Sequence, residues 1–545
     1  MNTPKNVAEL AIETLIANGI DQLYCLPGVQ NDHFFDALYD RTDGLRPIQS
    51  RHEQGAAYMA MGAALATGKQ QAFCVVPGPG FLNTTAALST AYAVNAPVLA
   101  LVGQIPLPAV GKGHGLLHEI PDQLSIMQGL TKHSARVNSG DDADQVLTDA
   151  MIHLQSGRPQ PVGVEIPVNV WRSPLAKGSN STALQIAAPK AAPPDEDAIK
   201  QAIALINSSK APMIVAGGGA MNFSQEVTQL TDAISAASLA FRNGQGVVSH
   251  ENDLRIGMPV AHQLWSETDL VIGLGTRLQS QVQAWGSDED LKIIHIDIDD
   301  TQLGRSAKTD IAINADLADA LPMLLAGMET NQRQDWRDRI ASAKAKMAKA
   351  YAQNLGPQLA WLNAIRMELP RQGIFVDELT QCGYVSRFAF PCFEPRTFIS
   401  TGYQGTLGYG FATALGVAHA RRDVPVVAIS GDGGALFTLS ELATAVHHKI
   451  PLTTVIFNDN AYGNVRRLQK DNYDSRFIAS ELTSPDFVKL AEGFGAIGMR
   501  ANTPEELRLK LREAIKSPEP VVIEVPVSEL PSPWDYVLMP KLRGI

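Results

Sequence analysis

Residues 426–467 read VVAISGDGGALFTLSELATAVHHKIPLTTVIFNDNAYGNVRR, and this stretch decides the fold. An apolar run rich in Val and Ile ends at Ser430, a glycine-rich turn follows over 431–434, and a helix is predicted from near Leu439. A second apolar run ends at Asn458. Such runs, without polar alternation, are typical of parallel strands that are buried on both faces and joined by helices. Both turns therefore fall at the carboxyl ends of adjacent strands, where α/β proteins bind ligands.

The polar residues of these two turns have the chemistry of a phosphate and metal site. The GDGG turn at 431–434 offers backbone N–H groups at the start of a helix, which suits a phosphate. Asp432 adds a carboxylate, and the NDN tripeptide at 458–460 adds further oxygen atoms. Oxygen ligands of this kind, together with a diphosphate, suit Mg²⁺. The alternative interpretation is a pair of ordinary strand-end turns.

The same pattern recurs along the chain and predicts an α/β fold. Apolar runs that end in Gly or Asp occur at 72–80, 211–219 and 292–299, with longer helical patterns between them. Strands that alternate with helices in this way predict several doubly wound parallel sheets.

Two segments without this pattern, 173–195 and 329–360, divide the chain. We therefore predict three domains, at 1–175, 190–330 and 357–545. The first and last domains share the order strand, glycine-rich turn, helix and strand, which predicts two related units on either side of a third.

The composition excludes several classes of protein. The chain has 545 residues, of which 45% are hydrophobic and 19% charged, so there is apolar material for several cores. A net charge of -11 gives the protein no general electrostatic attraction for nucleic acid. Four scattered cysteines make no disulfide framework, and no segment reads as a signal peptide or a membrane span. We expect a cytoplasmic protein without nucleic-acid or membrane partners.

Residues 431–460 resemble the thiamine diphosphate-binding motif, in which GDG is followed after about two dozen residues by NN or ND. Three upstream segments resemble further elements of the same family, in the family's order: LYCLPGVQNDHFFDAL (23–38), RHEQGAAYMAMGAALA (51–66) and VVPGPGFLNTTAALSTAYAVNAPVLALVGQIP (75–106). Over nearly its whole length the chain is similar to the branch that contains acetolactate synthase, pyruvate oxidase and benzoylformate decarboxylase. The resemblance implies a pyrimidine-binding first domain, a central domain and a diphosphate-binding third domain.

The resemblance also implies which residues hold the cofactor. The Mg²⁺ ligands would be Asp432, Asp459, which stands where many members have Asn, and the backbone carbonyl of Ala461. Leu407 would be the apolar wedge that bends the cofactor, and the carbonyl of Gly405 would hold its 4′-amino group. The remaining contacts implied for the cofactor are Thr380, Gln381, Gly431, Gly433, Gly434 and Tyr462.

Three residues are candidates for catalysis. Glu53 matches the family's glutamate that contacts N1′ of the aminopyrimidine, and a buried acid there favours the imino tautomer that acts as a base. The loop that follows Gly111 carries His114 and His118, either of which could orient the acceptor carbonyl or donate a proton. Acetolactate synthases have Phe-Gln-Glu where this chain has Leu-His-Glu at 117–119, which counts against ordinary acetolactate synthase activity. A solvent-facing histidine is the alternative for both positions.

The middle of the chain resembles the halves of a nucleotide-binding unit. Its turn at 216–221 reads AGGGAM rather than GxGxxG. Some relatives bind FAD here, and others bind an adenine nucleotide or nothing. FAD-binding synthases carry a longer GMxGMHG-type segment where this chain has only IGMPVAHQLW (256–265). We therefore do not expect FAD.

The implied activity is decarboxylation of pyruvate or a related 2-oxo acid and ligation of the product to a carbonyl acceptor, with thiamine diphosphate and Mg²⁺. A simple 2-oxo acid decarboxylase and a 2-hydroxyacyl-CoA lyase remain alternatives within the family. Outside it, a non-catalytic subunit of this fold is disfavoured by the presence of Glu53, Asp432 and Asp459, and a flavin-dependent oxidoreductase by the imperfect glycine turn. Because the family's glutamate reaches the cofactor of a second subunit, we expect a homodimer at minimum, and a homotetramer. The C-terminal segment at 529–545 could close over the site through Trp534 and Tyr536.

Overall fold

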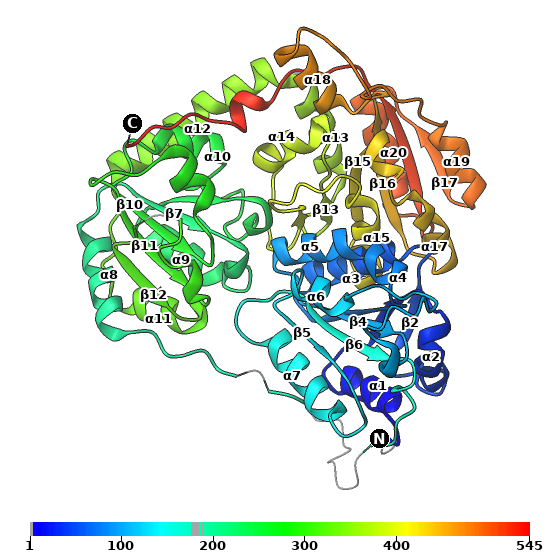
Figure 1. Cartoon of the computed structure of the whole chain (residues 1–545). Coiled ribbons are helices and arrows are strands. Elements are labelled where there is room, and N and C mark those ends of the chain that lie inside the picture. Colours follow the sequence, from blue (N-terminus) through cyan, green and yellow to red (C-terminus); the bar gives the residue numbers. More distant parts are fainter. Residues whose placement is uncertain (1–3, 176–184, 188, 307, 545) are drawn as a thin grey trace.

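A computed structural model describes residues 4–175, 185–187, 189–306 and 308–544, so that part of the predicted linker at 173–195 lies outside it. Within these residues the chain forms three six-stranded parallel sheets, each flanked by helices (Figure 1). The predicted α/β fold with three doubly wound units is confirmed. Across the described part of the chain, no helix combines the length and apolar character that crossing a membrane requires.

The N-terminal unit has its long apolar strands at the centre of the sheet, where both faces are covered. Its strand order is β2-β1-β3-β4-β6-β5, and Cys25 lies opposite Cys74 in the register of β1 and β3. The strands are β1 (Gln22–Cys25), β2 (Arg46–Gln49), β3 (Gln71–Val75), β4 (Val98–Gln104), β5 (His133–Arg136) and β6 (Val162–Pro167). The helices are α1 (Val7–Ala17), α2 (Asp32–Tyr39), α3 (Glu53–Thr67), α4 (Pro79–Asn83), α5 (Thr85–Val94), α6 (Gln123–Gln128) and α7 (Ala143–Gln155).

The C-terminal unit repeats this strand order, as β14-β13-β15-β16-β18-β17. Its strands are β13 (Ile374–Val376), β14 (Phe398–Ile399), β15 (Val426–Gly431), β16 (Leu452–Asn458), β17 (Ile497–Arg500) and β18 (Val521–Pro526). Its helices are α13 (Gly356–Glu368), α14 (Gln381–Ala389), α15 (Gly410–Ala420), α16 (Asp432–Ala435), α17 (Leu442–His447), α18 (Gly463–Asn472), α19 (Phe487–Phe494) and α20 (Pro504–Ala514). The identical order agrees with the expectation of two related outer units.

The central unit has a different topology. Read from β9, its order is β9-β8-β7-β10-β11-β12. All the strands are parallel, and the order in which they are added across the sheet reverses between β7 and β10, as in dinucleotide-binding folds. Its strands are β7 (Pro212–Ala216), β8 (Ala237–Ala240), β9 (Arg255–Ile256), β10 (Leu270–Leu274), β11 (Lys292–Asp297) and β12 (Ile311–Asn314). Its helices are α8 (Glu196–Ser208), α9 (Ser224–Ala233), α10 (Met258–Leu264), α11 (Leu317–Gly327) and the long α12 (Gln334–Asn354) that leads to the C-terminal unit.

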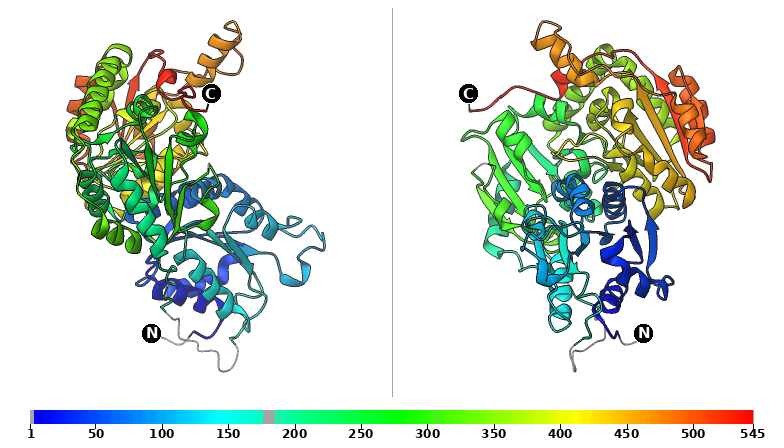
Figure 2. Two further views of the ribbon diagram at one scale, coloured as in Figure 1. Left: turned by 90° about the vertical axis from the view of Figure 1, so that its left-hand side faces the viewer. Right: turned by 45° about the vertical axis from the view of Figure 1, so that its right-hand side comes forward.

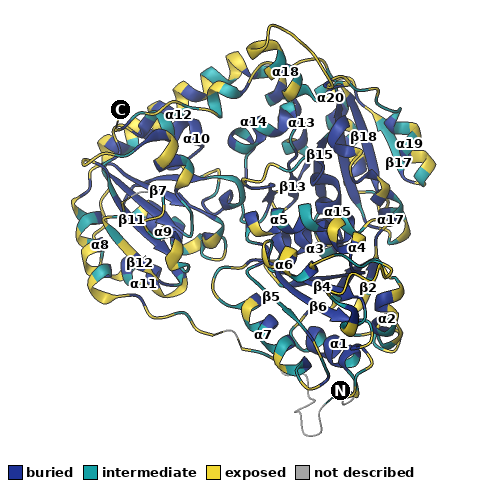
Figure 3. Ribbon diagram, viewed as in Figure 1, coloured by how far each residue is buried: buried dark blue, intermediate teal, exposed yellow. Residues whose placement is uncertain are grey.

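Helices α3 and α15 join the two outer units, and Figure 3 shows them as buried ribbons at that junction. Both are built from Ala, Gly and other small apolar residues, so their backbones approach closely. A Cβ atom added to Gly62 would lie 2.1 Å from the carbonyl oxygen of Thr413, and one added to Gly416 would lie 1.9 Å from that of Met59. Only glycine fits at these two positions.

The outer edge of the C-terminal unit carries exposed apolar side chains. Figure 2 shows α18, in orange, projecting from the body of the protein. Val465 and Leu468 on this helix are 47% and 43% exposed, and Ile478, in the segment after it, is 76% exposed. The C-terminal segment runs back to the central unit, where the N–H of Leu542 donates to the carbonyl of Trp285 at 2.8 Å (Figure 1).

Candidate functional site

Asp432 and Asp459 face each other at the carboxyl ends of the paired strands β15 and β16. Asp432 is buried and Asp459 half-buried. Each accepts a hydrogen bond from a neutral donor: Ser484 Oγ donates to Asp432 Oδ2 at 2.6 Å, and Gln381 Nε2 donates to Asp459 Oδ2 at 2.8 Å. Burial, and then the charge of Asp432, raise the pKa of Asp459 to about 6. The two acids therefore repel each other unless a cation lies between them.

A divalent cation fits this pair of carboxylates. Among the described residues, no Lys, Arg or His forms an ion pair with either acid. No third His, Cys, Asp or Glu side chain of the described residues joins them in a metal-binding cluster, so these two carboxylates are the acidic side chains available to a cation. A cation here would complete its shell with backbone carbonyls, water and ligand oxygens, as Mg²⁺ does in phosphate sites. Asp432 and Asp459 would supply two hard anionic ligands to such a cation, with other positions open to a diphosphate.

Both asparagine side chains of the tripeptide at 458–460 have hydrogen-bond partners within the C-terminal unit. Asn458 Nδ2 donates to Glu524 Oε1 at 2.8 Å beneath the turn, and Asn460 Oδ1 accepts the N–H of Ser484 at 3.2 Å. The side chain of this tripeptide that interacts with Asp432 is that of Asp459.

A cavity of about 270 Å³ adjoins the two acids, and all its described lining residues belong to the C-terminal unit. Side chains that line the cavity pack closely on the turn at 431–434. A Cβ atom at Gly433 would lie 2.7 Å from the ring of Tyr462, and one at Gly434 would lie 3.2 Å from Leu407 Cδ1. The structure thus brings most of the predicted cofactor residues to one cavity: Thr380, Gln381, Leu407, Gly431, Asp432, Gly433, Gly434, Asp459, Ala461 and Tyr462.

The helix predicted from near Leu439 is confirmed, because a 3-10 helix at Leu439–Glu441 continues directly into α17 from Leu442. The GDGG turn itself forms an additional short helix, α16, which starts at Asp432. Gly431 is extended, with φ −87° and ψ 160°, and caps the short helix. Thr380 caps α14 in the same way, its Oγ1 accepting the N–H of Gly383 at 2.9 Å. Two helix N-termini therefore border the cavity, and both favour an anion.

Gly405 is not among the residues that line this cavity. It is exposed, with φ +57°, in the loop before α15. Its neighbour Thr406 lies against the N-terminal unit, with Thr406 Oγ1 2.9 Å from Thr90 Oγ1. The contact implied between the Gly405 carbonyl and the cofactor stays a prediction.

The C-terminal segment covers one side of the cavity. Trp534 lines it, packs against Tyr384 with ring centroids 5.0 Å apart, and donates its Nε1–H to Asn464 Oδ1 at 3.1 Å. Gln381 Oε1 accepts the N–H of Leu530 at 2.6 Å, so that one amide side chain contacts both this segment and Asp459. Tyr536 packs on Tyr351 and Phe388 and does not reach the cavity.

Glu378 is a buried acid beside the site that the sequence analysis did not single out. Its carboxylate accepts the N–H groups of Leu379 and Gly410, each at 2.9 Å, and burial raises its pKa to about 8. A Cβ atom at Gly434 would lie 3.6 Å from its carboxyl carbon. Its place shortly after the end of β13 and two residues before Thr380 was the available signal.

Glu53 begins α3 and lies in the N-terminal unit, away from the cavity of Asp432. Its Oε2 accepts Asn83 Nδ2 at 3.0 Å. A Cβ atom at Gly80 would lie 3.5 Å from its Oε1, so the turn at 77–80 borders the acid. Within one chain, Glu53 and Asp432 therefore do not share a cavity.

The two candidate histidines differ in their surroundings. His114 is exposed, and its ring has no hydrogen-bond partner among the described residues. His118 is half-buried, and its Nδ1 lies 3.0 Å from Oε1 of the buried Gln30. Gln30 was not predicted from the sequence as a site residue.

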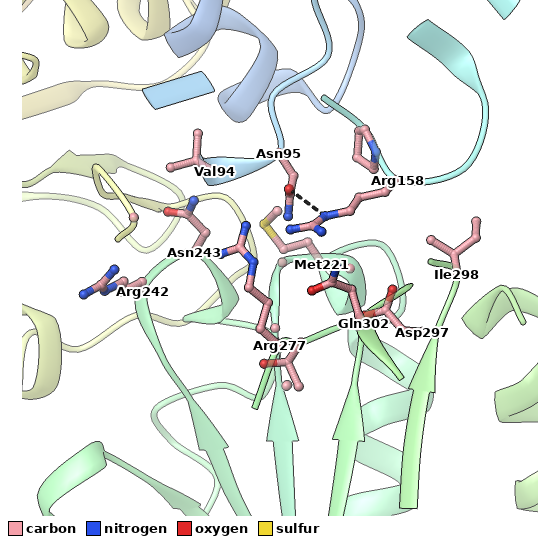
Figure 4. Close-up of a pocket in the computed structure, with 18 of the residues that line it drawn as sticks. Val94, Asn95, Arg158, Met221, Arg242, Asn243, Arg277, Asp297, Ile298 and Gln302 are labelled. Carbon is pink, nitrogen blue, oxygen red and sulfur yellow. Dashed lines mark hydrogen bonds between the residues drawn. The ribbon is translucent and has the colours of Figure 1, made fainter. Parts of the chain in front are cut away.

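A second cavity, of about 420 Å³, lies between the central unit and its neighbours at the carboxyl ends of β7 and β10 (Figure 4). The glycine turn at 217–219 borders it, together with Arg158, Arg242 and Arg277. Arg158 donates to Asn95 Oδ1 at 2.9 Å and pairs with Asp299 at 3.2 Å. The expectation that no FAD binds here stays a prediction.

Comparison with known families agrees with this geometry. Residues 5–126 match the N-terminal TPP binding domain of thiamine pyrophosphate (thiamine diphosphate) enzymes. Residues 199–324 match the central domain of these enzymes. Residues 380–525 match their C-terminal TPP binding domain.

The chain is also similar to whole proteins. It is 32% identical to a probable acetolactate synthase large subunit of Methanocaldococcus jannaschii, over 96% of this chain and 93% of that protein. It is 30% identical to the large subunit of acetolactate synthase isozyme 1 of Escherichia coli, over 95% and 93%. It is 29% identical to a probable 2-ketoarginine decarboxylase of Pseudomonas aeruginosa, over 94% and 93%. The chain therefore belongs to the family of thiamine diphosphate-dependent enzymes, in its acetolactate synthase-like branch.

Proposed function

We propose that this enzyme binds thiamine diphosphate through Mg²⁺, decarboxylates a 2-oxo acid and joins the product to a carbonyl acceptor. The observation that carries the proposal is the pair Asp432 and Asp459, whose repulsion is relieved by no protein cation among the described residues. Carboxylates of this kind bind a hard divalent cation and, through it, a diphosphate.

The chain's own groups have distinct tasks at this site. Asp432, Asp459 and the carbonyl of Ala461 would hold the cation, and the amides of 431–434 and of the α14 N-terminus would hold the phosphate oxygens. Leu407, which lines the cavity beside Gly434, offers an apolar support for the thiazolium ring. When bound, thiamine diphosphate supplies a carbon nucleophile and an electron sink for loss of carbon dioxide.

We propose that a second copy of the chain completes the site. All the described lining residues of the cavity come from the C-terminal unit, so the cavity of one chain does not contain Glu53, the acid predicted for the pyrimidine ring. Glu53 of a second subunit would supply this acid and favour the imino tautomer through N1′. A homodimer is then the smallest active form, and a homotetramer is its expected assembly.

Simple decarboxylation is the second candidate. The observation in its favour is His118, which stands beside the turn at 77–80 and can return a proton to the product carbon in place of a carbonyl acceptor. One of the relatives is named a probable 2-ketoarginine decarboxylase. Formation of aldehyde without hydroxyketone would identify this activity.

Two measurements test the proposal. Calorimetric titration with Mg²⁺ and thiamine diphosphate should give saturable heat for the native protein, and D432N and D459N should each weaken binding at least about 10-fold, since each removes an anionic ligand. D471N, which changes an exposed acid of the same unit, is the matched control. A panel of pyruvate and longer 2-oxo acids, with and without aldehydes, is then analysed for carbon dioxide and hydroxyketones. Absence of binding heat in the native protein would refute the proposal.

A further inference from the structure

The loop that presents His118 is held in one shape by its own acid. Glu119 Oε1 accepts the N–H groups of Gly113 and His114, at 3.0 and 3.2 Å, and its Oε2 accepts that of Leu116 at 2.9 Å. These hydrogen bonds from backbone N–H groups lower the pKa of Glu119, and the hydrogen bond from Leu116 makes the largest contribution. The acid is therefore charged at neutral pH and keeps the loop folded around it.

The backbone of His118 is fixed against the turn that borders Glu53. His118 has φ +67°, and a Cβ atom at Gly78 would lie 2.3 Å from its carbonyl oxygen, so the contact requires glycine at 78. The N–H of Gly78 donates to the buried Gln123 Oε1 at 2.9 Å. Because Glu53 lies beside Gly80, two residues further along the same segment, the backbone of His118 and the carboxylate of Glu53 both border residues 78–80.

Gln30 fixes the ring of His118. It is 6% exposed, in the helical turn Val29–Asn31, and its Nε2 donates to the carbonyl of Leu117 at 3.1 Å. This bond points the amide oxygen of Gln30 at His118 Nδ1, 3.0 Å away. Because that oxygen only accepts, Nδ1 must carry the proton. In the neutral ring Nε2 then holds the lone pair, and it has no partner among the described residues.

We propose that Gln30 is a positioning residue, which holds the proton of His118 on Nδ1 so that Nε2 exchanges protons with the substrate. This inference rests on the proposed function. When the acceptor carbonyl is attacked, its π electron pair moves to the oxygen, and the protonated ring gives its Nε2 proton to that oxygen. The ring becomes neutral, and its Nδ1–H stays hydrogen-bonded to the amide oxygen of Gln30. Solvent then returns a proton to Nε2. A fixed tautomer keeps the correct nitrogen aimed at the substrate.

A double-mutant cycle tests whether Gln30 acts through His118. Gln30→Met keeps the side-chain length and removes the acceptor, and should lower kcat about 10-fold with KM changed less than about 2-fold. In a His118→Asn background the same substitution should change kcat less than about 2-fold, because its target is gone. Equal losses in both backgrounds would overturn the inference and assign Gln30 a purely structural role. Gln128→Met, at an exposed position of the same unit, is the matched control.

Nitrogen-15 solid-state NMR of the sedimented protein gives a readout without turnover. The protein has 12 histidines, and the difference between native and His118→Gln spectra isolates the ring of residue 118. The native ring should show a protonated Nδ1 and a bare Nε2, and Gln30→Met should redistribute the proton between them. A native ring protonated on Nε2 would overturn the inference even in an active enzyme. If the ring has the expected tautomer but the protein binds no thiamine diphosphate, the proposed function fails instead.

Discussion

Gly62 of α3 and Gly416 of α15 hold equivalent positions on the two helices that join the outer units. Gly62 lies against the backbone carbonyl of Thr413, three residues before Gly416. Gly416 in turn lies against the backbone carbonyl of Met59, three residues before Gly62. Each helix also connects the second and third strands of its unit in chain order. The contact is therefore reciprocal, as it is across a two-fold axis.

Because both contacts are with backbone atoms, a methyl group at either position forces the helices apart. Gly416→Ala should lower the free energy of unfolding by about 1–3 kcal/mol, as overpacking does in tight cores. Urea denaturation followed by circular dichroism measures it. Gly493→Ala is the control, since this exposed helical glycine has nothing within 4 Å of an added Cβ atom. That variant should be neutral or more stable by up to about 1 kcal/mol, and equal losses in both variants would contradict the packing argument.

Glu53→Gln should preserve binding of Mg²⁺ and thiamine diphosphate but lower kcat about 100-fold or more, because the amide keeps the shape of the side chain and loses the acid. Calorimetry and steady-state decarboxylation measure the two effects separately. Asn83→Ala removes only the partner of Glu53 Oε2 and should have a smaller effect. Native turnover in Glu53→Gln would exclude the role given to this residue.

His419, on α15, links the stability of the junction to pH. Burial, followed by the charges of Arg422, His448 and Arg46, lowers its pKa to about 4. Its pKa in the unfolded chain is about 6.5, so between these values the unfolded chain binds the additional proton. Stability should therefore fall as the pH falls from about 6.5 to 4, by up to about 3 kcal/mol from this residue.

Unfolding curves measured across this range should show a shallower pH dependence in His419→Gln than in the native protein. His114→Gln, which changes an exposed histidine, should leave the slope unaltered. An unchanged slope in His419→Gln would show that the ring is not buried in its neutral form.

Trp534→Ala should open one wall of the cavity beside Asp432 and Asp459. Release of bound thiamine diphosphate should then be about 10-fold faster, as measured by stopped-flow fluorescence. The variant loses both the contact with Tyr384 and the hydrogen bond to Asn464. Tyr536→Phe, in the same segment but away from the cavity, should release the cofactor at the native rate. Similar rates in the native protein and Trp534→Ala would exclude a retaining role for the tryptophan.

The second cavity, at the carboxyl ends of β7 and β10, leads to a prediction about the absorbance of the purified protein. The turn at 216–221 lacks the third glycine of a dinucleotide fingerprint, so we expect the purified protein to show no flavin absorbance. A yellow protein that releases FAD on denaturation would contradict this expectation.

The sequence predicted the strands well and individual side-chain partners poorly. The uninterrupted apolar runs that end at Ser430 and Asn458 left no other class than parallel α/β, and three such sheets are present. The pairing of Asp432 with Asp459 followed from the rule that parallel strands end at one edge. The inward turn of Asn458 and the additional short helix at Asp432–Ala435 depend on local dihedral angles that periodicity does not report.

Gln30 could not be found from the sequence because its partner, His118, comes from a loop far along the chain. Glu378 gave only its position, since its burial comes from the packing of separate segments. The residues taken from the family resemblance reach one cavity except for Gly405, Glu53 and the two histidines. For Glu53 a second copy would complete the site, and only the family resemblance indicated this, because Glu53 does not line the cavity of Asp432 within one chain.

The N-terminal and C-terminal units have the same strand order and contact each other through equivalent helices, α3 and α15. A single polypeptide therefore has the arrangement that is usual for a homodimer. Two copies of one unit joined in a single chain would give this arrangement, with a pseudo-two-fold axis where a homodimer has a true one. In the proposed site the two units differ in their tasks, since one carries the acid Glu53 and the other the carboxylates Asp432 and Asp459. A substitution in either unit would then impair the same reaction.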